Sequence, residues 1–473
     1  MKTHSTEIVV LGAGPGGYAA AFYAAEKGKT VTLVEQSDRL GGTCLTVGCI
    51  PSKTLLHAAK LLTEAADSGF RGITFGTPQI DLRKMREWKE SIVDKLAAGV
   101  AGLAEKRKVK VLYGRGYFED SKTLRVESQE GQQFVTFEQA IIAVGSRPAM
   151  PDAFNLGNRR IMTSTEALDL DEVPRDLLIV GGGYIGMELG TVYATLGSSV
   201  VVAEALPSVL QGADQDLVRP VLRRVEKLFK EIRTGIKVQK MATAGKQIMV
   251  TMEVEGKSRE ELYDRVLVSV GRVPNTTDLG LENTRVARDE RGFIKANERQ
   301  QTADPNIYAI GDVAGGVLLA HKATKEARVA VEVITGENST FEHIIIPAVI
   351  FTDPEIAWCG LTEQEAREKN VAVEVVKFPW SASGRALSFD RTDGMTKLIV
   401  DPETERVLGV GIVGSGAGDL ISEGVLALEM GATAKDLAES VHPHPTLSET
   451  IAEAAEAFYG TAIHTVSRRR KQD

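Results

Sequence analysis

The chain of 473 residues contains little cysteine and no long hydrophobic run. Its thiols are Cys44, Cys49 and Cys359. Three cysteines are too few for a secreted disulfide scaffold, and no CxxC pair of the kind that binds zinc is present. No apolar run reaches the ~18 residues that a membrane-spanning helix needs. We therefore expect no membrane span and no metal site, and we expect the close pair of cysteines to serve redox chemistry.

Positive charge is also scarce. The net charge is -8 and the isoelectric point is near 5.6, which argues against nucleic acid as a partner, because phosphate binding needs a basic face. The amino-terminal segment 1–7 has neither the apolar core of a signal peptide nor an Arg-rich transit pattern. We expect a cytoplasmic protein, although an organellar protein written from its mature start has the same appearance. The length predicts two to four domains.

One module of strand, glycine turn, helix, strand and acid occurs twice. In the first copy, a strand at 7–11 precedes Gly12, Gly14 and Gly17, and the next strand ends at Glu35. In the second copy, a strand at 177–180 precedes Gly181, Gly183 and Gly186. The next strand ends at Glu204, which is as far from Gly181 as Glu35 is from Gly12. Such glycines let the backbone and a helix amino terminus approach a pyrophosphate, and the acid accepts from a ribose hydroxyl. Because both copies are complete, we expect two dinucleotide sites rather than two ligand-free turns.

The second acid also indicates which nicotinamide nucleotide binds. The carboxylate of Glu204 repels a 2′-phosphate, and no Arg follows it before Arg219. NAD is therefore favoured over NADP.

From about residue 346 the pattern changes to strands followed by helices, which is typical of a separate α+β domain. The basic run 468–471 is interpreted as a solvated end of the chain.

The most specific segment is Gly41–Lys53, GGTCLTVGCIPSK, which contains two cysteines in a CxxxxC spacing. At the start of a helix this spacing brings the two sulfurs close enough to bridge, and the helix start stabilises a thiolate. Two buried structural cysteines are the alternative interpretation of the spacing alone.

This segment resembles the redox-active disulfide stretch of the pyridine nucleotide–disulfide oxidoreductases. The resemblance extends over essentially the whole chain, through both glycine modules, the segment TADPNIYAIGD at 302–312 and the segment HPHPTLSE at 442–449. It implies an α/β protein with two Rossmann-like domains that bind FAD and NAD, and a carboxy-terminal α+β dimerisation domain. The expected boundaries are 1–150 for the FAD domain, 151–272 for the NAD domain, 273–345 for a central domain that completes the FAD site, and 346–473 for the interface domain.

The resemblance also implies the catalytic residues. Cys44 is similar to the thiol that attacks the dithiol substrate, and Cys49 to the flavin-side thiol that forms a charge-transfer complex. Lys53 is similar to the lysine beside the flavin, paired with Glu188, although alone it reads as a surface helix lysine. His444 is similar to the acid/base and Glu449 to its orienting carboxylate. Two alternatives remain, because Thr446–Glu449 also fits a capping box and His442 lies near His444.

The expected cofactor contacts follow from the same resemblance. For FAD they are Gly12, Gly14, Gly17, Glu35, Gly42, Thr43, Lys53, Gly116, Ser146, Asp312 and Ala320. For NAD they are Gly181, Gly183, Tyr184, Ile185, Gly186, Glu204, Val238, Val270 and Gly271. A helix that begins at Ala320 is expected to direct its positive end toward the flavin.

Members of this family that oxidise protein-bound dihydrolipoamide with NAD are the most similar. That similarity implies a homodimer, and as partners the lipoyl domains and core acyltransferase of 2-oxo acid dehydrogenase complexes or a lipoylated H-type carrier protein. Another disulfide reductase of the family is the nearest alternative, and a non-catalytic flavoprotein subunit is an alternative of a different class. The intact set of Cys44, Cys49, His444 and Glu449 argues against the second.

Replacing Glu204 with Ala should weaken the use of NAD and barely change the flavin content, because the carboxylate belongs to the second dinucleotide site only. Steady-state kinetics with NAD and NADP, together with the flavin absorbance of the purified variant, measure both effects. Equal use of NADP by the unmodified protein contradicts the role given to Glu204.

Overall fold

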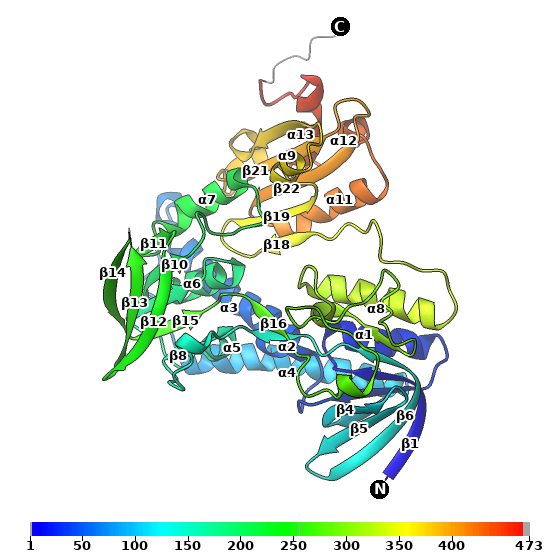
Figure 1. Ribbon diagram of the computed structural model, residues 1–473. Helices are drawn as coiled ribbons and strands as arrows, with labels where there is room; N and C mark the ends of the chain where they lie inside the picture. Colours follow the sequence, from blue (N-terminus) through cyan, green and yellow to red (C-terminus); the bar gives the residue numbers. More distant parts are fainter. Residues whose placement is uncertain (1, 255, 467–473) are drawn as a thin grey trace.

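Three sheets and their helices form the body of the protein in the computed structural model, which describes residues 2–254 and 256–466 (Figure 1). The basic run expected to be a solvated end lies outside the described residues. Among the described helices, none combines the length and the apolar character needed to cross a membrane. The α/β class and the carboxy-terminal α+β domain are confirmed.

The first sheet contains the amino terminus. Its parallel strands are β1 (Lys2–Leu11), β2 (Val31–Glu35), β3 (Lys110–Tyr113), the inner part of β6 (Gly131–Ile142) and β17 (Ile307–Ala309), and β4 (Arg115–Asp120) and β5 (Thr123–Ser128) extend it antiparallel. Helices α1 (Pro15–Glu26) and α8 (Ala320–Ile334) pack side by side on this sheet (Figure 1). Apolar residues of β1 and β2 are buried on both faces, as expected for strands covered by helices. Residues 273–345 thus contribute a strand and a helix to the first sheet.

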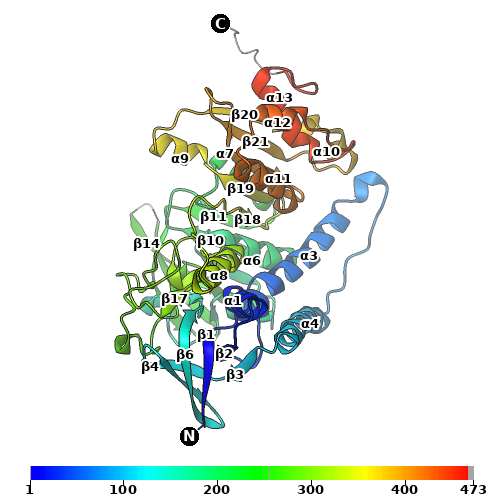
Figure 2. The same cartoon turned by 90° about the vertical axis from the view of Figure 1, so that its right-hand side faces the viewer.

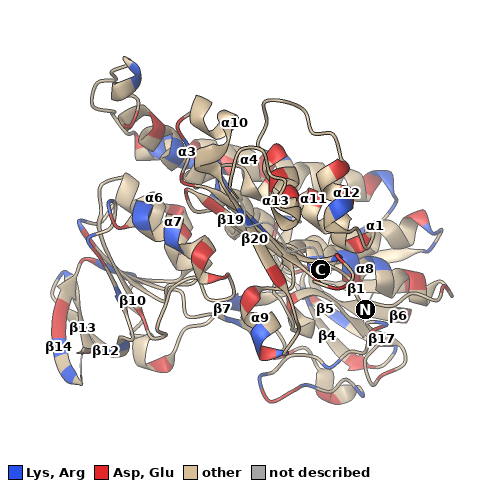
Figure 3. Ribbon diagram, turned by 90° about the horizontal axis from the view of Figure 1, so that it is seen from above, with Lys and Arg blue, Asp and Glu red and all other residues tan. Residues whose placement is uncertain are grey.

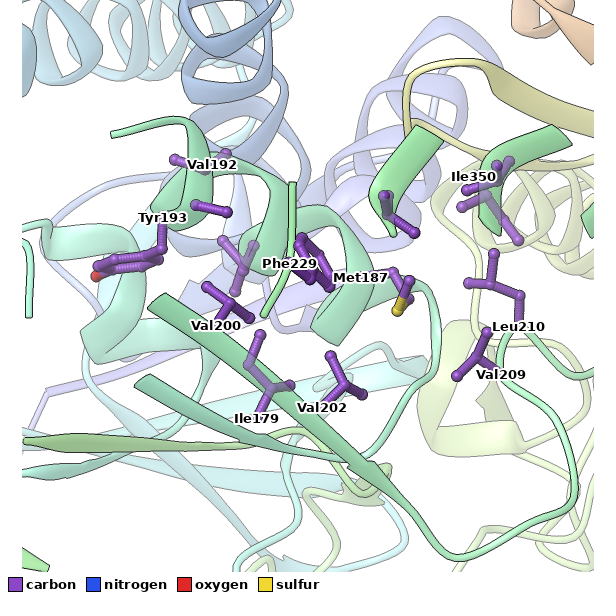
Figure 4. Packing of buried hydrophobic residues seen from close by; sticks show 14 of the residues in the cluster. Ile179, Met187, Val192, Tyr193, Val200, Val202, Val209, Leu210, Phe229 and Ile350 are labelled. Carbon is purple, nitrogen blue, oxygen red and sulfur yellow. The ribbon is translucent and has the colours of Figure 1, made fainter. Parts of the chain in front are cut away.

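The second sheet repeats the plan. Its parallel strands run β11 (Glu231–Thr234), β10 (Ser199–Glu204), β9 (Asp176–Val180), β15 (Arg265–Val268) and β8 (Ile161–Met162). Helices α5 (Ser164–Asp169), α6 (Tyr184–Thr195) and α7 (Gln215–Val225) accompany it. Figure 4 shows Met187 and Val192 of α6 facing Ile179, Val200 and Val202 of the strands, so the helix packs directly on the sheet.

Two small antiparallel sheets complete this region. One consists of β12 (Lys237–Ala244), β13 (Gln247–Val254) and β14 (Lys257–Tyr263), and the other of β7 (Ser146–Pro148) and β16 (Arg272–Pro274). The β7–β16 pair joins the carboxyl ends of the two parallel sheets, because β7 follows β6 and β16 follows β15. It therefore places residues from both modules at one junction.

The third sheet is antiparallel and lies at the opposite end of the molecule from the amino terminus (Figures 1 and 2). Its order is β18 (Ala348–Ile350), β19 (Glu355–Gly360), β22 (Val407–Gly414), β21 (Met395–Val400) and β20 (Glu374–Pro379). Its helices are α9 (Glu363–Glu368), α10 (Gly384–Ser388), α11 (Ala417–Glu429), α12 (Ala434–Glu439) and α13 (Glu449–Tyr459). Figure 3 shows acidic and basic residues interspersed on α9 and α12, where Arg367 faces Glu363 and Lys435 faces Glu439.

Two further helices connect the first module to the rest. Helix α3 (Cys49–Ala66) contacts α6 of the second module, and α4 (Leu82–Lys106) contacts α3 (Figure 2). Two polar contacts join this helical pair to the second module: Lys89 of α4 donates to the carbonyl of Leu168 at 2.7 Å, and Arg224 of α7 contacts Asp67, just after α3, at 2.7 Å. These contacts help to hold the second module against the first.

A buried ion network holds the second and third sheets together. The ammonium of Lys397, whose side chain is 1% exposed, lies 2.6 Å from Asp214, 2.8 Å from Asp216 and 3.0 Å from Glu363. Lys377 adds a second ammonium 2.6 Å from Asp216. Burial raises the pKa of Asp216, but the two lysines outweigh it and hold that pKa below its ordinary value. The carboxylates near the start of α7 are thereby fixed to strands of the third sheet.

Replacing Lys397 with Met should destabilise the protein by about 3–5 kcal/mol, because removing one partner leaves buried carboxylates without their cation. Replacing Lys435 with Gln, which removes only an exposed ion pair, should cost less than about 1 kcal/mol. Urea unfolding of the flavin-loaded proteins measures both. The contribution of Asp216 should persist above about pH 4 and fade in more acid solution, since its folded pKa is lowered. Equal stability of the two variants contradicts this view of the network.

Candidate active site and cofactor clefts

The two glycine turns have the same construction. A Cβ added to the first glycine of each turn would lie 2.5 Å from a backbone carbonyl oxygen. That oxygen belongs to Ala143 in the case of Gly12 and to Ser269 in the case of Gly181. A Cβ on the third glycine would meet the carbonyl of the first, at 1.8 Å for Gly17 and 2.2 Å for Gly186. The second glycine of each turn is open: a Cβ on Gly14 meets nothing closer than 3.9 Å and one on Gly183 nothing within 4 Å. Each turn therefore suits the approach of a phosphate to a helix amino terminus.

The acid of each module supports its own glycine turn. Glu35 accepts the N–H of Ala13 at 2.7 Å, and Glu204 accepts the N–H of Gly182 at 2.6 Å, the equivalent position. Their other oxygens accept the N–H of Ser37 at 2.8 Å and of Leu206 at 2.7 Å. The acids thus stand at the ends of β2 and β10 and also hold the turns, a structural role that the sequence pattern did not reveal.

A continuous cleft extends from the first glycine turn to the redox cysteines and on to the second module. Among the residues predicted for FAD, the cleft is lined by Gly12, Gly14, Glu35, Gly42, Thr43, Lys53, Ser146, Asp312 and Ala320. Gly17 lies behind the turn, and Gly116 lines an adjoining pocket with Gly12 and Glu35. Helix α8 begins at Ala320 as expected. An extended dinucleotide fits this cleft, since glycines, a helix amino terminus and a terminal carboxylate follow one another along it.

Some of the residues predicted for NAD line the cleft, and others lie beside it or in the core. Tyr184 and Ile185 begin α6 and line the same cleft from the second module. Val270 is exposed and Gly271 has a φ of 121° at the junction beside β16. Val238 packs in the hydrophobic core with Val201 and Ile248, so its side chain does not face a cleft.

Several residues at the centre of the cleft were not anticipated. Arg272 donates to the hydroxyl and to the carbonyl of Ser146, each at 2.7 Å, and lies 3.7 Å from Asp312. Ser146 in turn donates to Asp312. Only Gly271 of this segment was predicted as a site residue, although the same stretch supplies Asn275, which donates to the carbonyl of Val144 at 3.0 Å.

A buried ion pair on α8 holds the Asp312 segment. Lys322 lies 2.8 Å from Glu326, and it also donates to the carbonyl of Gly315 at 2.8 Å. Glu326 accepts the N–H of Gly311 at 2.7 Å. Burial raises the pKa of Glu326, against the effect of Lys322. The i, i+4 spacing of these two residues on a predicted helix was the available signal.

The two redox cysteines lie on two helices, which corrects the expectation of a single helix start. Cys44 belongs to α2 (Gly42–Val47), and Cys49 is the first residue of α3. The two helices are separated at Gly48, where an added Cβ would lie 2.7 Å from the carbonyl oxygen of Thr43. The glycine therefore permits a tight turn that returns Cys49 toward Cys44.

The two thiols differ in acidity. The hydrogen bond from Cys44, opposed by burial and assisted by Lys53, lowers the pKa of Cys49 to about 7. The same hydrogen bond, together with burial, raises the pKa of Cys44 well above its ordinary value. The pair therefore loses its first proton from Cys49, near pH 7, while Cys44 keeps its proton.

Lys53 and Glu188 form an ion pair in the cleft. Their side chains meet at 2.8 Å, and the second oxygen of Glu188 accepts the N–H of Phe351 at 2.9 Å. Lys53 also lies over the ring of Phe351, 4.6 Å from its centroid. Because Lys53 is one helical turn after Cys49, the ion pair fixes a cation beside the thiolate.

The second group of candidate residues lies before α13. Nδ1 of His444 lies 2.8 Å from Glu449, whose other oxygen accepts the N–H of Thr446 at 2.7 Å. Burial raises the pKa of Glu449, but Thr446 and His444 outweigh it and hold the pKa below its ordinary value. The peptide bond between His444 and Pro445 is cis. Helix α13 begins at Glu449, and no side chain caps it. Of the capping box that was the alternative role for Glu449, only the contact from the N–H of Thr446 to Glu449 is present.

His442 and His444 differ in solvent exposure and in the contacts of their rings. His442 has a side chain that is 9% exposed and contacts Glu423 at 2.7 Å, whereas the side chain of His444 is 75% exposed. No hydrogen bond within the described chain uses Nε2 of His444. This nitrogen is therefore available to a group from outside the subunit.

The histidine loop and the cysteines lie far apart in one chain. Figure 1 shows α13 in the upper part of the molecule and α2 in its middle, and Figure 2 shows α13 well above the base of α3, where Cys49 lies. The cleft that contains Cys44 and Cys49 is lined by residues up to Ala323 only. The chain alone does not bring the two halves of the site together.

Comparison with known proteins identifies the family. The pyridine nucleotide-disulphide oxidoreductase family model matches residues 6–327, and the dimerisation domain of the same family matches residues 346–455. The chain belongs to the pyridine nucleotide-disulphide oxidoreductases, whose cofactors here are FAD and NAD, and it forms a homodimer.

Particular relatives are similar over their whole length. The chain is 45% identical to a dihydrolipoyl dehydrogenase of Vibrio cholerae (100% of this chain, 99% of the relative) and 46% identical to one of Haemophilus influenzae (100% and 98%). Among solved structures, LpdA of Mycobacterium tuberculosis has a TM-score of 0.90 at 27% identity, covering 96% of this chain and 99% of that one. The HOCl-induced flavoprotein disulfide reductase RclA of Escherichia coli, in its Cu(II) complex, has a TM-score of 0.86 at 28% identity, with the same coverage.

Replacing Cys44 with Ser should leave a long-wavelength absorbance band in the flavin-loaded protein, because Cys49 then remains as a thiolate beside the flavin. Replacing Cys49 with Ser should remove that band. In the reduced unmodified protein the band should fade as the pH falls below about 7, since the lowered pKa of Cys49 keeps the thiolate present only above that value. Visible spectra of both variants test the assignment, and the reverse pattern means that the two cysteines have exchanged roles.

Proposed function

We propose that the protein oxidises protein-bound dihydrolipoamide to lipoamide with NAD as electron acceptor. The observation that carries the proposal is the placement of Cys44 and Cys49 on either side of the turn at Gly48, in one cleft with the Lys53–Glu188 ion pair. The relatives named dihydrolipoyl dehydrogenase, at about 45% identity over the full length, support this choice of substrate.

The chemistry is thiol–disulfide exchange with a positioned base. Nε2 of His444 takes a proton from a substrate thiol, and the thiolate attacks the sulfur of Cys44 in the oxidised pair. The Cys44–Cys49 bond breaks, and Cys49 leaves as a thiolate, which its lowered pKa favours. The second substrate thiol then attacks the mixed disulfide and its proton passes to the departing Cys44. Lipoamide forms, and His444 releases the first proton to solvent.

Glu449 serves this step by orientation. Its contact with Nδ1 fixes the imidazole and stabilises the imidazolium formed when Nε2 takes the proton. Thr446 holds the carboxylate in turn through its backbone N–H. Glu449 therefore orients the ring and also holds the turn before the helix.

FAD, held by the first glycine turn, Glu35, Ser146 and Asp312, supplies the redox relay between the dithiol and NAD. We assign the FAD domain to 1–150, its completion to 273–345, the NAD domain to 151–272 and the interface domain to 346–473. The two equivalent glycine turns and the β17 strand in the first sheet support this division.

The partner subunit is proposed as the source of the base, because the histidine loop and the cysteines lie far apart within one chain (Figure 1). The lipoyl domains and core acyltransferase of 2-oxo acid dehydrogenase complexes, or a lipoylated H-type carrier protein, are proposed as macromolecular partners. A cytoplasmic location is proposed as well, since these substrates and NAD meet there in bacteria such as those of the relatives.

An assay of dihydrolipoamide oxidation with NAD and NADP side by side tests the function. Rapid turnover with NAD supports it, whereas turnover of other disulfides without lipoamide activity favours the disulfide reductase alternative that the likeness to RclA suggests. A dithionite titration tests the non-catalytic alternative. Uptake of more than about two electrons per FAD shows a working disulfide.

Replacing His444 with Gln should lower lipoamide turnover roughly 10²–10⁴-fold, the usual contribution of a positioned acid/base. Reduction of the flavin by NADH should change far less, because hydride transfer needs no base from this loop. Steady-state assays and stopped-flow reduction measure the two steps separately. Equal loss in both steps contradicts the role of His444 in the dithiol half-reaction.

A further inference from the structure

The loop that carries His444 has little support from its own backbone. It spans Ser440–Pro445 between α12 and α13, and His442 alone among these six residues is not exposed. Val441 is fully exposed, at 98%. Within the described chain, no backbone N–H of residues 441–445 donates to a backbone carbonyl, and the two prolines have none to donate. Side chains must therefore fix the position of this loop.

His442 supplies the contact on the side of α11. Its Nδ1 lies 2.9 Å from the carbonyl oxygen of Ser440, and its Nε2 lies 2.7 Å from Oε1 of Glu423 in the middle of α11. The two ring nitrogens of His442 thus contact two different elements, the chain at the end of α12 and the middle of α11.

The other supports of the loop lie at its two ends. The hydroxyl of Ser440 donates to the carbonyl of Asp436 on α12 at 2.7 Å. On the side of α13, the hydroxyl of Thr446 donates to the carbonyl of Pro443 at 2.7 Å, and Glu449 contacts the ring of His444. The Glu423–His442 contact is the support between these ends that ties the loop to α11, two residues before His444.

We propose that His442 is a positioning residue for the acid/base His444, acting through Glu423 of α11. The proposal rests on the proposed function for its catalytic consequence, and on the contacts of the loop for its structural part. A displacement of a reacting group by about 1 Å costs up to about 100-fold in rate. Loss of the Glu423 contact should therefore lower the turnover number for dihydrolipoamide and leave its KM nearly unchanged.

Two amide substitutions separate the two contacts of the ring. In His442→Asn, the amide nitrogen replaces Nδ1, so it retains the contact with Ser440 and loses Glu423. In His442→Gln, the amide nitrogen replaces Nε2, so it retains Glu423 and loses Ser440. We expect His442→Asn and Glu423→Ala to lower the turnover number about tenfold to a hundredfold, and His442→Gln to stay within about threefold of the unmodified protein. Lys435→Gln, on the neighbouring α12, is the matched control and should have no effect.

Two further measurements distinguish positioning from a general loss of structure. Stopped-flow reduction of the flavin by NADH should be unchanged in all variants, and urea unfolding should shift by similar amounts in His442→Asn and His442→Gln, since each loses one hydrogen bond. Amide hydrogen exchange of a peptide that covers 440–447 should be faster in His442→Asn and Glu423→Ala than in His442→Gln.

A failure of this proposal can be told apart from a failure of the proposed function. If the unmodified protein does not oxidise dihydrolipoamide, the proposed function fails, and the exchange rates alone decide whether the Glu423–His442 pair orders the loop. Equal turnover and equal exchange in the two amide variants overturn the proposal, as does a parallel loss of flavin reduction.

Discussion

Dithiol oxidation needs a base within hydrogen-bond reach of the sulfur that is attacked. In this chain the attacked sulfur and the base lie far apart, with Cys44 on α2 in the middle of the molecule and His444 before α13 in its upper part. The thiols lie beside the Lys53–Glu188 ion pair, and the imidazole of His444 is oriented by Glu449. The homodimer is the assembly that reconciles these two facts. The rigid connections within the chain, above all the buried Lys397 network, then keep the two ends at a fixed separation.

Electron transfer toward NAD depends on a second feature, the construction that the two glycine turns share. Both glycine turns bury the first and third glycine against a backbone carbonyl and leave the second open, and both acids support the turn from behind. The β7–β16 pair joins the carboxyl ends of the two parallel sheets. One cleft thus receives residues from both modules, including Tyr184 from one and Ser146 from the other. This continuity suits the passage of electrons from a dithiol to a nicotinamide nucleotide.

Much of this site is visible in the sequence because its residues occur in short segments. The glycine spacings, the cysteine segment and HPHPTLSE each require particular residues at adjacent positions, so pattern alone locates them. The break at Gly48 was missed, because the sequence shows a glycine but not the carbonyl of Thr43 that it must pass. Arg272 and the Lys322–Glu326 pair were missed because their partners are distant in sequence or belong to the backbone. Val238 stays a prediction for NAD: its side chain packs in the core, and which face a strand residue presents depends on register, which the sequence alone does not fix.

The shared site has one direct test, in mixed dimers of two inactive chains. One chain carries Cys44→Ser and retains His444, and the other carries His444→Gln and retains Cys44. If the base comes from the partner subunit, each mixed dimer contains one site with both functional residues and should show about half of the unmodified lipoamide turnover. Mixed dimers that form, as shown by separable affinity tags, and yet have no activity above that of the parent variants contradict a site shared between subunits.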